Sequence, residues 1–162
     1  TNNRTSHPMK LILAGETDKA LIRRMLRDYL EELSAYGSID NDYPYFDLYW
    51  QETNQRWPYI FSDGETVGGF AMVRMLGQNG VIFSMAEFAV LPAVRRNGLG
   101  RAMAVSAMHR HPGTWEISAM AGNGEALAFW PKAISAAGAA RFEVSSGPEE
   151  TTYRFSIAPS IS

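Results

Sequence analysis

Apolar residues follow two different spacings along this chain, and each spacing predicts its own kind of element. Between Asp18 and Leu33 they recur every three or four positions, which predicts an amphipathic helix that Thr17 or Asp18 caps. Short apolar runs bounded by turn residues predict about seven strands, at residues 9–14, 57–62, 67–76, 81–90, 114–120, 141–146 and 151–157. Helical spacing also predicts a short helix over 46–57 and longer ones over 98–108 and 125–137.

The order of the predicted elements is that of one α/β domain with a mixed sheet. Asp63-Gly64 and Gly147-Pro148 predict hairpins between neighbouring strands. Pro131 falls inside the last helical pattern, where we expect it to kink or break the helix. No repeat or linker divides the chain, so we predict a single domain over 9–158, preceded by a polar, flexible segment over 1–8.

Composition narrows the classes of protein to which this chain can belong. It has 162 residues, of which 46% are hydrophobic and 20% charged, as is ordinary for a soluble globular domain. The net charge of −2 gives no reason to expect nucleic acid or a membrane surface as a partner, and no apolar run approaches the roughly 20 residues of a membrane-spanning helix. The chain has no cysteine, which excludes disulfides, thiolate metal sites and a cysteine nucleophile. We expect a cytoplasmic protein without a metal site.

The segment between the predicted strand over 81–90 and the following helix carries candidate chemistry. It contains the pattern Val90-x-Pro92-x-x-Arg95-x-x-Gly98-x-Gly100. Glycines let the backbone approach an anion, and the first turn of a helix presents N–H groups without intrahelical partners, so the segment suits a pyrophosphate. Neither the Gly-x-x-x-x-Gly-Lys-Ser/Thr string of a P-loop nor the Gly-x-Gly-x-x-Gly/Ala dinucleotide fingerprint is present.

This segment resembles the acyl-CoA binding motif of the GNAT superfamily, the acyl-CoA-dependent N-acyltransferases. The resemblance implies the GNAT fold, in which a mixed β-sheet splays after its fourth strand with about four helices around it, and it implies acetyl-CoA as cosubstrate. It also implies that Phe88 and Val90 face the pantetheine arm through their backbone groups. The residues implied around the CoA pyrophosphate are Arg95, Arg96, Asn97, Gly98, Leu99 and Gly100, with Arg101 beside them.

A second motif is similar to the GNAT helix that lies beside the CoA arm. It reads Asn123-x-x-Ala126-x-x-Phe129-Trp130-x-Lys132, and the resemblance implies cofactor contacts for Asn123, Phe129 and Trp130. Many family members have Tyr where this chain has Trp130, and that Tyr often protonates the departing thiolate. An indole N–H cannot act as an acid near neutral pH, so the usual general acid is absent at this position. For Phe129, plain core packing is the alternative.

Glu87, within the predicted strand over 81–90, is the candidate general base. Some GNAT enzymes carry a strand glutamate here that takes a proton from the amine, and burial in so apolar a strand raises the pKa of a carboxyl. The alternative is that Glu87 faces solvent or pairs with an arginine. The backbone N–H groups of Val90 and Leu91 are candidates for binding the thioester carbonyl and its oxyanion. Tyr153 is a candidate for the missing acid, with packing as the alternative.

The acceptor region is predicted from charge. Residues 28–52 are rich in acidic and aromatic side chains and contain no Lys or Arg. Such a wall attracts a cationic amine through charge and cation–π contact. We expect four of its residues to bind the acceptor: Asp42, Tyr45, Asp47 and Trp50. The alternative is that the acids form a solvated helix face and the aromatics belong to the core.

The combined prediction is an acetyl-CoA-dependent N-acetyltransferase that acts on a primary amine by direct transfer through a tetrahedral intermediate. The acceptor is a small molecule or a peptide, and a homodimer is compatible with this function. A non-catalytic acyl-CoA sensor with the same fold is the alternative that Trp130 keeps open, and a domain binding another phosphorylated ligand is a third. His109 and His111 are expected at a solvated helix terminus rather than in a metal or catalytic site.

Overall fold

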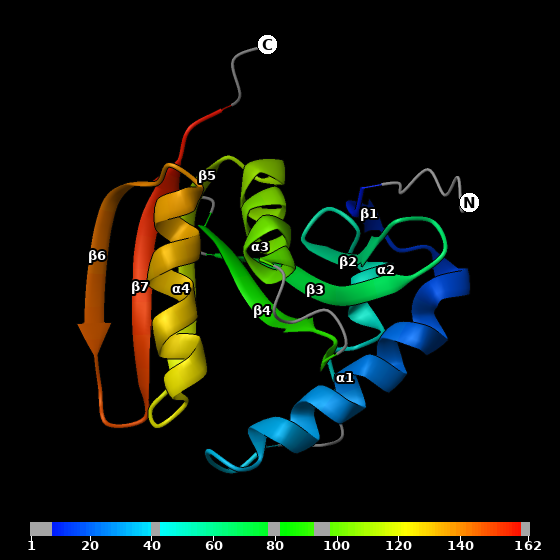
Figure 1. The fold of residues 1–162 in the computed structure, drawn as a ribbon, viewed down its shortest axis with the longest axis horizontal. Helices are drawn as coiled ribbons and strands as arrows, with labels where there is room; N and C mark the ends of the chain where they lie inside the picture. The colour runs from blue at the N-terminus through cyan, green and yellow to red at the C-terminus, as the bar shows by residue number, and fades with distance from the viewer. Residues whose placement is uncertain (1–7, 40–42, 78–81, 93–97, 160–162) are drawn as a thin grey trace, which may run out of the picture.

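The fold is a seven-stranded β-sheet with helices on both faces (Figure 1). The structure is a computed structural model, and it describes residues 8–39, 43–77, 82–92 and 98–159. In chain order the elements are β1 (Lys10–Leu13), the 3-10 helix η1 (Glu16–Asp18), α1 (Lys19–Leu33), α2 (Leu48–Gln51), β2 (Arg56–Ser62), β3 (Val67–Leu76), β4 (Ile82–Val90), α3 (Leu99–Arg110), β5 (Gly113–Met120), α4 (Gly124–Ala136), β6 (Ala140–Ser146) and β7 (Glu150–Ile157). The predicted strands and the three long helices are confirmed.

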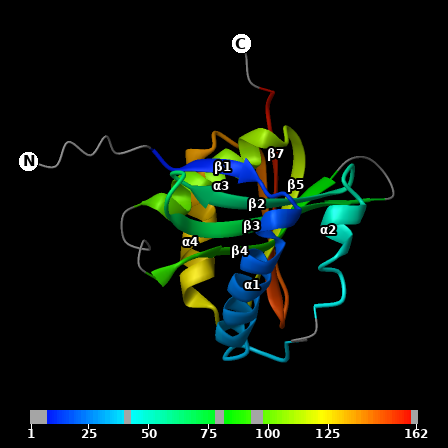
Figure 2. The same cartoon turned by 90° about the vertical axis from the view of Figure 1, so that its right-hand side faces the viewer.

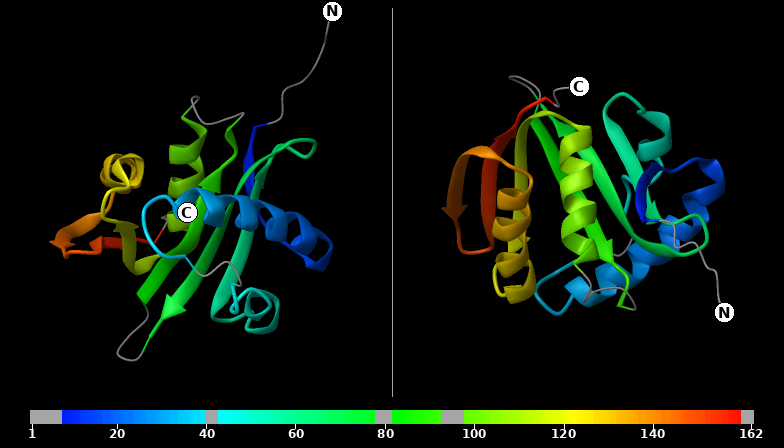
Figure 3. Two further views of the ribbon diagram at one scale, coloured as in Figure 1. Left: turned by 90° about the horizontal axis from the view of Figure 1, so that it is seen from below. Right: turned by 45° about the horizontal axis from the view of Figure 1, so that its top comes forward.

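The sheet splits between its fourth and fifth strands. The strand order is β1-β2-β3-β4-β5-β7-β6, and each neighbouring pair is antiparallel except β4 with β5. In the described chain this parallel pair is joined over Ile82–Ser84 and Thr114–Glu116 alone. Beyond these residues the two strands diverge, which leaves two arms of sheet with an opening between them (Figures 1 and 3). The predicted splay is therefore confirmed.

Two apolar cores lie on opposite faces of the sheet (Figure 2). On one face, Ile22 and Leu26 of α1 cluster with Phe70 and Met72 of β3. On the other face, α3 and α4 cluster with β5 and β7 around the fully buried Trp115. Because burial removes the apolar stripe of each helix from water, it fixes which side of each helix meets the sheet.

The predicted helix over 46–57 is much shorter in the structure. α2 has four residues, since a turn over 44–47 precedes it and the chain re-enters the sheet at Arg56. Aromatic residues at helical spacing suggested more helix than forms, because the rings of this segment pack onto the sheet from a turn. Phe46 is 2% exposed although it lies before the helix.

Helix α4 continues through Pro131, where a kink or break was expected. Proline has no N–H to bond the carbonyl four residues earlier, which belongs here to Leu127. The hydroxyl of Tyr153 on β7 donates to that carbonyl at 3.4 Å. A side chain from the sheet thus supplies the hydrogen bond that Pro131 removes, which explains how the helix remains continuous.

His111 is buried, which contradicts the expected solvated helix terminus. His111 comes directly after α3, and its ring packs against three aromatic rings. The centroid distances are 4.5 Å to Trp57, 5.0 Å to Phe83 and 6.3 Å to Trp115. The Nε2 atom lies 2.7 Å from the hydroxyl oxygen of Tyr59. Burial lowers the pKa of His111 to about 4. His109 remains exposed, with Nε2 2.8 Å from the Ala137 carbonyl oxygen.

The buried His111 predicts a loss of stability in mild acid. Its pKa is about 4 when folded and 6.5 when unfolded, so the unfolded chain binds the proton more strongly. This stabilisation is present above pH 6.5 and disappears as the pH falls towards 4. We expect the titration of His111 to lower the free energy of unfolding by about 2 kcal/mol between pH 7 and pH 5. The variant His111→Gln should lack this part of the pH dependence. Urea unfolding at both pH values measures it, and equal pH dependence in the two proteins would contradict it.

Candidate active site

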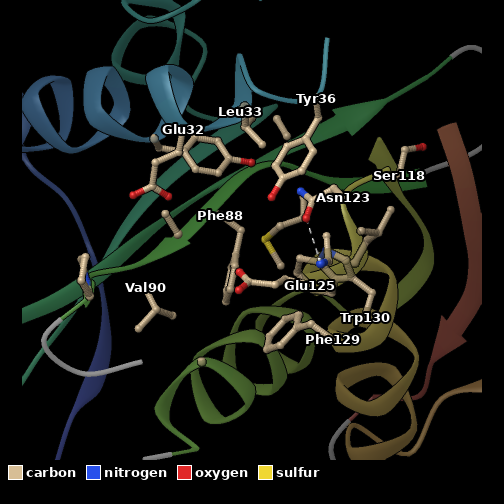
Figure 4. A pocket seen from close by; sticks show the side chains of 18 residues that line it. Glu32, Leu33, Tyr36, Phe88, Val90, Ser118, Asn123, Glu125, Phe129 and Trp130 are labelled. Carbon is tan, nitrogen blue, oxygen red and sulfur yellow. Dashed lines mark hydrogen bonds between the residues drawn. The ribbon is translucent and has the colours of Figure 1, made fainter. Parts of the chain in front are cut away.

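A cleft of about 840 Å³ lies where β4 and β5 diverge (Figure 4). The end of α1 forms one wall, and β5 with the start of α4 forms the opposite wall, while β4 and Gly100 of α3 complete the lining. The side chains that Figure 4 labels on this cleft are Glu32, Leu33, Tyr36, Phe88, Val90, Ser118, Asn123, Glu125, Phe129 and Trp130. A second groove of about 500 Å³ runs beside it between α1 and the end of β4, and the two share Tyr29 and Glu32.

The first turn of α3 lies against β4 and α4 because Gly100 has no side chain. A Cβ at this position would lie 3.1 Å from Cγ2 of Val90 and 3.4 Å from Cε1 of Phe129. Gly98 precedes the helix with φ of 70°, a left-handed conformation that favours glycine. Helix geometry leaves the first N–H groups of α3 without intrahelical acceptors, so this end of the helix suits an anion.

The predicted pyrophosphate residues fall partly within the described chain. Gly98, Leu99, Gly100 and Arg101 form the start of α3, and Gly100 lines the cleft. Arg95, Arg96 and Asn97 lie outside the described residues. Their role as anion ligands stays a prediction.

The Asn123 motif forms the wall opposite α1. Asn123 caps α4 by accepting a hydrogen bond from the Ala126 N–H at 3.2 Å. Phe129 and Trp130 pack against Phe88, with ring centroids 5.5 and 5.0 Å apart. All of these residues line the cleft, so the motif that suggested a cofactor helix also builds the aromatic floor of this cavity.

Backbone hydrogen bonding determines which amides of β4 face the opening. The Leu91 N–H donates to the Gly68 carbonyl at 2.8 Å, so this amide belongs to the β3 side. In an antiparallel pair, N–H groups point alternately towards the partner strand and away from it. The N–H groups of Phe88 and Val90 are therefore directed towards the opening. This corrects the expectation for Leu91 and replaces its amide with that of Phe88.

A β-bulge lies in β4 where the strand leaves β5. The register pairs Met72 with Glu87 but Val73 with Met85, so Ala86 is an extra residue in β4. A bulge bends its strand and increases the local twist. This bend accompanies the divergence of the two arms and places Glu87 at the point where the sheet opens.

The Glu87 carboxyl is buried on the face of the sheet that α1 and α2 cover. It shares this face with its cross-strand partner Met72, which belongs to the core under α1. Oε2 of Glu87 is buried and has no hydrogen-bond partner among the described residues. Burial raises the pKa of Glu87 to about 8, against the opposing effect of the positive charge of Arg74. A carboxyl with this pKa exchanges a proton readily near neutral pH.

Comparison with known proteins identifies the family. The family model described as "Acetyltransferase (GNAT) family" matches residues 22–133. The chain belongs to the GNAT acetyltransferase family. No curated protein matches it in sequence.

Solved GNAT structures share the fold at low sequence identity. PaiA N-acetyltransferase from Thermoplasma acidophilum in complex with coenzyme A is 9% identical, with a TM-score of 0.66 over 91% of this chain and 98% of that chain. Spermidine N-acetyltransferase from Vibrio cholerae in complex with CoA and spermine is 10% identical, with a TM-score of 0.63 over 91% and 94%. An acetyltransferase from Bacillus subtilis in complex with CoA is 14% identical, with a TM-score of 0.62 over 92% and 99%.

Tyr153, the candidate acid of this GNAT protein, does not line the cleft within the described chain. The residue is 3% exposed, and its ring stacks on Phe142 at 6.0 Å. Its hydroxyl is the donor to the Leu127 carbonyl, and burial raises the pKa of this phenol. These contacts support the packing alternative for Tyr153.

The predicted acceptor residues are not brought to the cleft where the structure describes them. Asp47 is paired with Lys19 at 2.9 Å and with Arg23 at 3.7 Å, and these cations lower the pKa of its carboxyl. Trp50 donates to the Gly15 carbonyl at 3.2 Å and packs on Phe46. Tyr45 lies against the guanidinium of Arg56, and Asp42 lies outside the described residues.

In this GNAT domain, α1 and the turn after it form the wall of the cleft that faces α4. Tyr29, Glu32, Leu33 and Tyr36 line the cleft, and the hydroxyl of Tyr36 points across it towards Asn123 (Figure 4). All four fall within the window 28–52 that was expected to form the acceptor wall, but none is among the four residues that were singled out from it. Their spacing of three and four residues was a usable signal, since it places them on one stripe at the end of the helix.

Two features that the described residues lack bear on the kind of site this is. None of their His, Asp and Glu side chains gather in threes with the geometry of metal ligands. None of their helices is both long enough and apolar enough to cross a membrane.

Proposed function

We propose that this protein is an N-acetyltransferase that transfers the acetyl group of acetyl-CoA directly to a primary amine. The observation that carries the proposal is the buried carboxyl of Glu87 on β4, which lies in the chain between the cleft-lining residues Ala86 and Phe88 without lining the cleft itself. Family membership supports the acetyl group, and the GNAT neighbours crystallised with CoA support this cosubstrate. The start of α3 holds the pyrophosphate in this proposal, and β4 lies along the pantetheine arm.

The reaction asks little more of the site than a base and an oxyanion site. An alkylammonium has a pKa of about 10.4, so a proton must leave before the nitrogen can attack, and Glu87 accepts it. The amine then attacks the thioester carbon, and the N–H groups of Phe88 and Val90 stabilise the oxyanion. A thiol has a pKa of about 8.5, so the thiolate departs without a dedicated acid. This is why Trp130 in place of Tyr is compatible with turnover.

The acceptor proposed for the cleft is a cationic amine, as a small molecule or as part of a peptide. Glu32 on one wall and Glu125 on the other both line the cavity. Tyr29 and Tyr36 add aromatic surface to the same wall as Glu32. Two carboxylates and aromatic rings around a cavity favour a positively charged guest through Coulomb attraction and cation–π contact.

A thiol-release assay tests the proposed function. Purified protein is incubated with acetyl-CoA and a panel of diamines, polyamines, aminoglycosides and lysine peptides, and free CoA thiol is measured. Release that depends on one amine class supports the proposal and names the acceptor. Binding of acetyl-CoA by calorimetry without thiol release from any amine contradicts it.

Exchanging Glu32 for glutamine is expected to raise the KM for a cationic acceptor about tenfold, because a like-sized neutral group removes one of the attracting charges. The KM for acetyl-CoA should stay within about twofold. Asp47→Asn is the matched control, since Asp47 lies at the surface and is paired with Lys19. If Asp47→Asn raised the acceptor KM more than Glu32→Gln does, the acceptor would bind at the segment that contains Asp47, and the proposed cleft wall would be wrong.

An acyl-CoA sensor is the second candidate, and Trp130 is the feature that favours it. The indole is buried against Phe88 at the position where many family members carry a phenol. A sensor would bind CoA and release no thiol in the assay above. Competition between CoA and nucleotides would separate both functions from a domain for another phosphorylated ligand.

A further inference from the structure

Strand β6 forms an open edge of the sheet (Figure 1). In the described chain it pairs with β7 alone, and all seven of its residues are exposed. An open strand presents N–H and C=O groups to any second strand that approaches it, and folded proteins rarely leave an apolar edge uncovered. The side chains and backbone of β6 therefore indicate what kind of strand fits beside it.

Two large apolar side chains of β6 are uncovered on the face of the sheet that carries α4. Phe142 is 45% exposed and Val144 is 52% exposed. The ring of Phe142 stacks on that of Tyr153, and Val144 is the register partner of Tyr153 on β7. Tyr153 belongs to the core beneath α3 and α4, and its hydroxyl reaches α4. The apolar layer of this core thus continues to the β6 edge and ends there without cover.

The outward backbone groups of β6 include those of Val144 and Ser146. The Gly147 N–H donates to the Glu150 carbonyl at 2.8 Å, so the backbone groups of Gly147 face β7. Because these groups alternate along an antiparallel strand, every second residue from Gly147 back to Glu143 faces β7. The residues between them, Val144 and Ser146, direct their N–H and C=O groups away from the sheet.

One register makes this edge complementary to itself. With a two-fold axis at Val144, an antiparallel second β6 lets the two Val144 residues exchange both backbone hydrogen bonds. Each Phe142 then lies diagonal to Val144 of the other copy, so the apolar side chains of both copies form one row. A two-fold axis at Glu143 would instead pair residues whose backbone groups face β7, and it would set two carboxylates opposite each other.

The charges on the opposite face are compatible with the register at Val144. Glu143 is the register partner of Arg154, which pairs with Glu116 at 3.1 Å. In the symmetric pair, Glu143 lies opposite Ser145 of the second copy, so no like charges face each other directly. The strand contains one Arg and one Glu, so its net charge of zero gives no repulsion between two copies of it.

A β-bulge limits the length of the edge that can pair. The register with β7 shifts between Ala140 and Glu143, where Arg141 has φ of 57°. A bulge bends its strand and interrupts regular pairing. The regular edge therefore covers residues 142–146 alone, and pairing it buries less than the roughly 1,200 Å² at the low end of stable interfaces. We expect a dimer with a dissociation constant of about 1–100 μM.

We propose that the β6 edge is an interface between two copies of this chain, paired antiparallel about a two-fold axis at Val144. The two sheets then continue into each other, and β1 of each copy lies at an outer end. No residue of β6, all of which the structure describes, lines the cleft or the second groove. Each copy therefore keeps its own site.

Sedimentation velocity between about 1 and 200 μM tests this interface. The wild-type protein should change from monomer to dimer over this range. Val144→Lys and Val144→Glu should each remain monomeric, because like charges meet at the axis, while an equal mixture of the two should form dimers, because a lysine then faces a glutamate. A monomeric wild type, dimeric single variants or a monomeric mixture would each overturn the proposal.

Leu13→Lys is the matched control for the lysine variant. Leu13 is 54% exposed on β1, at the opposite edge of the sheet. This change should leave the dissociation constant within about twofold, because it lies outside the proposed interface. If Leu13→Lys dissociated the dimer as well, β1 of one copy would pair with β6 of the next, and the symmetric interface would be wrong.

Cross-linking through Val144→Cys gives a second readout. The chain has no cysteine, so the introduced thiol is its only one. Opposite residues of a hydrogen-bonded antiparallel pair have Cα atoms about 5.5 Å apart, which a disulfide can bridge. Mild oxidation should therefore cross-link Val144→Cys at least about tenfold faster than Leu13→Cys. Equal rates in the two variants would contradict contact at Val144.

These measurements are independent of the proposed function, since none of them needs acetyl-CoA or an amine. Circular dichroism checks that each variant is folded. A wild-type protein that releases no thiol but dimerises through Val144 would contradict the acetyltransferase and leave the interface in place. A wild-type monomer that releases thiol would do the reverse.

Discussion

Replacing Glu87 with glutamine should lower kcat by about a hundredfold or more while making the folded protein more stable at pH 8. The loss of activity follows because an amide cannot take the proton of the acceptor ammonium. The gain in stability follows because wild-type Glu87 has one buried oxygen without a hydrogen-bond partner among the described residues and is costly to ionise. The burial that raises the pKa of Glu87 therefore also lowers the free energy of unfolding of the wild-type protein at pH 8.

The pH dependence of this stability gain has a definite sign. The pKa of Glu87 is about 8 in the folded protein and 4.5 when unfolded, so the unfolded chain loses the proton first as the pH rises. The stability that the protein has while Glu87 is protonated is fully present below pH 4.5. It is lost as the pH rises from 4.5 to 8, because the carboxyl of the unfolded chain ionises first. This difference corresponds to roughly 4 kcal/mol at pH 8. Since the amide also needs partners when buried, we expect Glu87→Gln to recover about 2 kcal/mol of it.

Urea unfolding at pH 5 and pH 8, with thiol-release kinetics on the same samples, measures both effects. Glu116→Gln is the control, because Glu116 is a partly exposed carboxylate on β5 that pairs with Arg154 at 3.1 Å. It should change neither kcat nor the pH dependence of unfolding. A Glu87→Gln protein with wild-type kcat would exclude Glu87 as the base, whatever its stability.

Exchanging Gly100 for aspartate should weaken CoA binding by about a hundredfold or more. The new Cβ would lie 3.1 Å from Cγ2 of Val90, which must shift slightly, and in contact with Phe129 at 3.4 Å, and a carboxylate would stand at the first turn of α3. Like charges repel strongly in a partly dry site, and this is where the pyrophosphate is proposed to bind. The helix itself tolerates the change, because an acidic residue near its N-terminus interacts favourably with the helix dipole.

Calorimetry with CoA measures this effect, and circular dichroism checks that the variant is folded. Gly100→Ala separates the two causes, since it adds the Cβ without the charge, and it should lose much less affinity than Gly100→Asp. A folded Gly100→Asp protein that binds CoA like the wild type would move the proposed pyrophosphate site away from α3. Adding Arg95→Glu to Gly100→Asp then tests the contribution of the preceding loop.

The fold was predictable because its local signals agree with its long-range packing. The apolar stripe of α1 is the stripe that the core buries, since Ile22, Met25, Leu26 and Leu30 face the sheet. The turn residues Asp63-Gly64 form the expected hairpin between β2 and β3, with the Asp63 N–H donating to the Thr66 carbonyl at 3.2 Å. Where the apolar spacing of the sequence matches the residues that the core buries, that spacing is sufficient to predict the element.

The site was predictable only where a motif is contiguous in the chain. Residues Asn123 to Trp130 follow one another on α4, so their spacing places them on the cleft together. The direction of the Leu91 amide depends on the register with β3, and the bulge at Ala86 has no mark in the sequence. Charge alone drew attention to Asp47, but the cations that neutralise it, Lys19 and Arg23, lie on α1.

Three residue pairs join β4 and β5, so the two arms of the sheet share only a short stretch of backbone hydrogen bonding within the described chain. Elsewhere the two arms of the sheet meet through side chains, such as Phe88 of β4 against Phe129 and Trp130 of α4, and through whatever binds in the cleft between them. A ligand bound in the cleft contacts both arms of the sheet. Its binding therefore raises the free energy of unfolding of the whole domain. For such an architecture, the concentration of the ligand in the cell sets part of the free energy of unfolding of the protein.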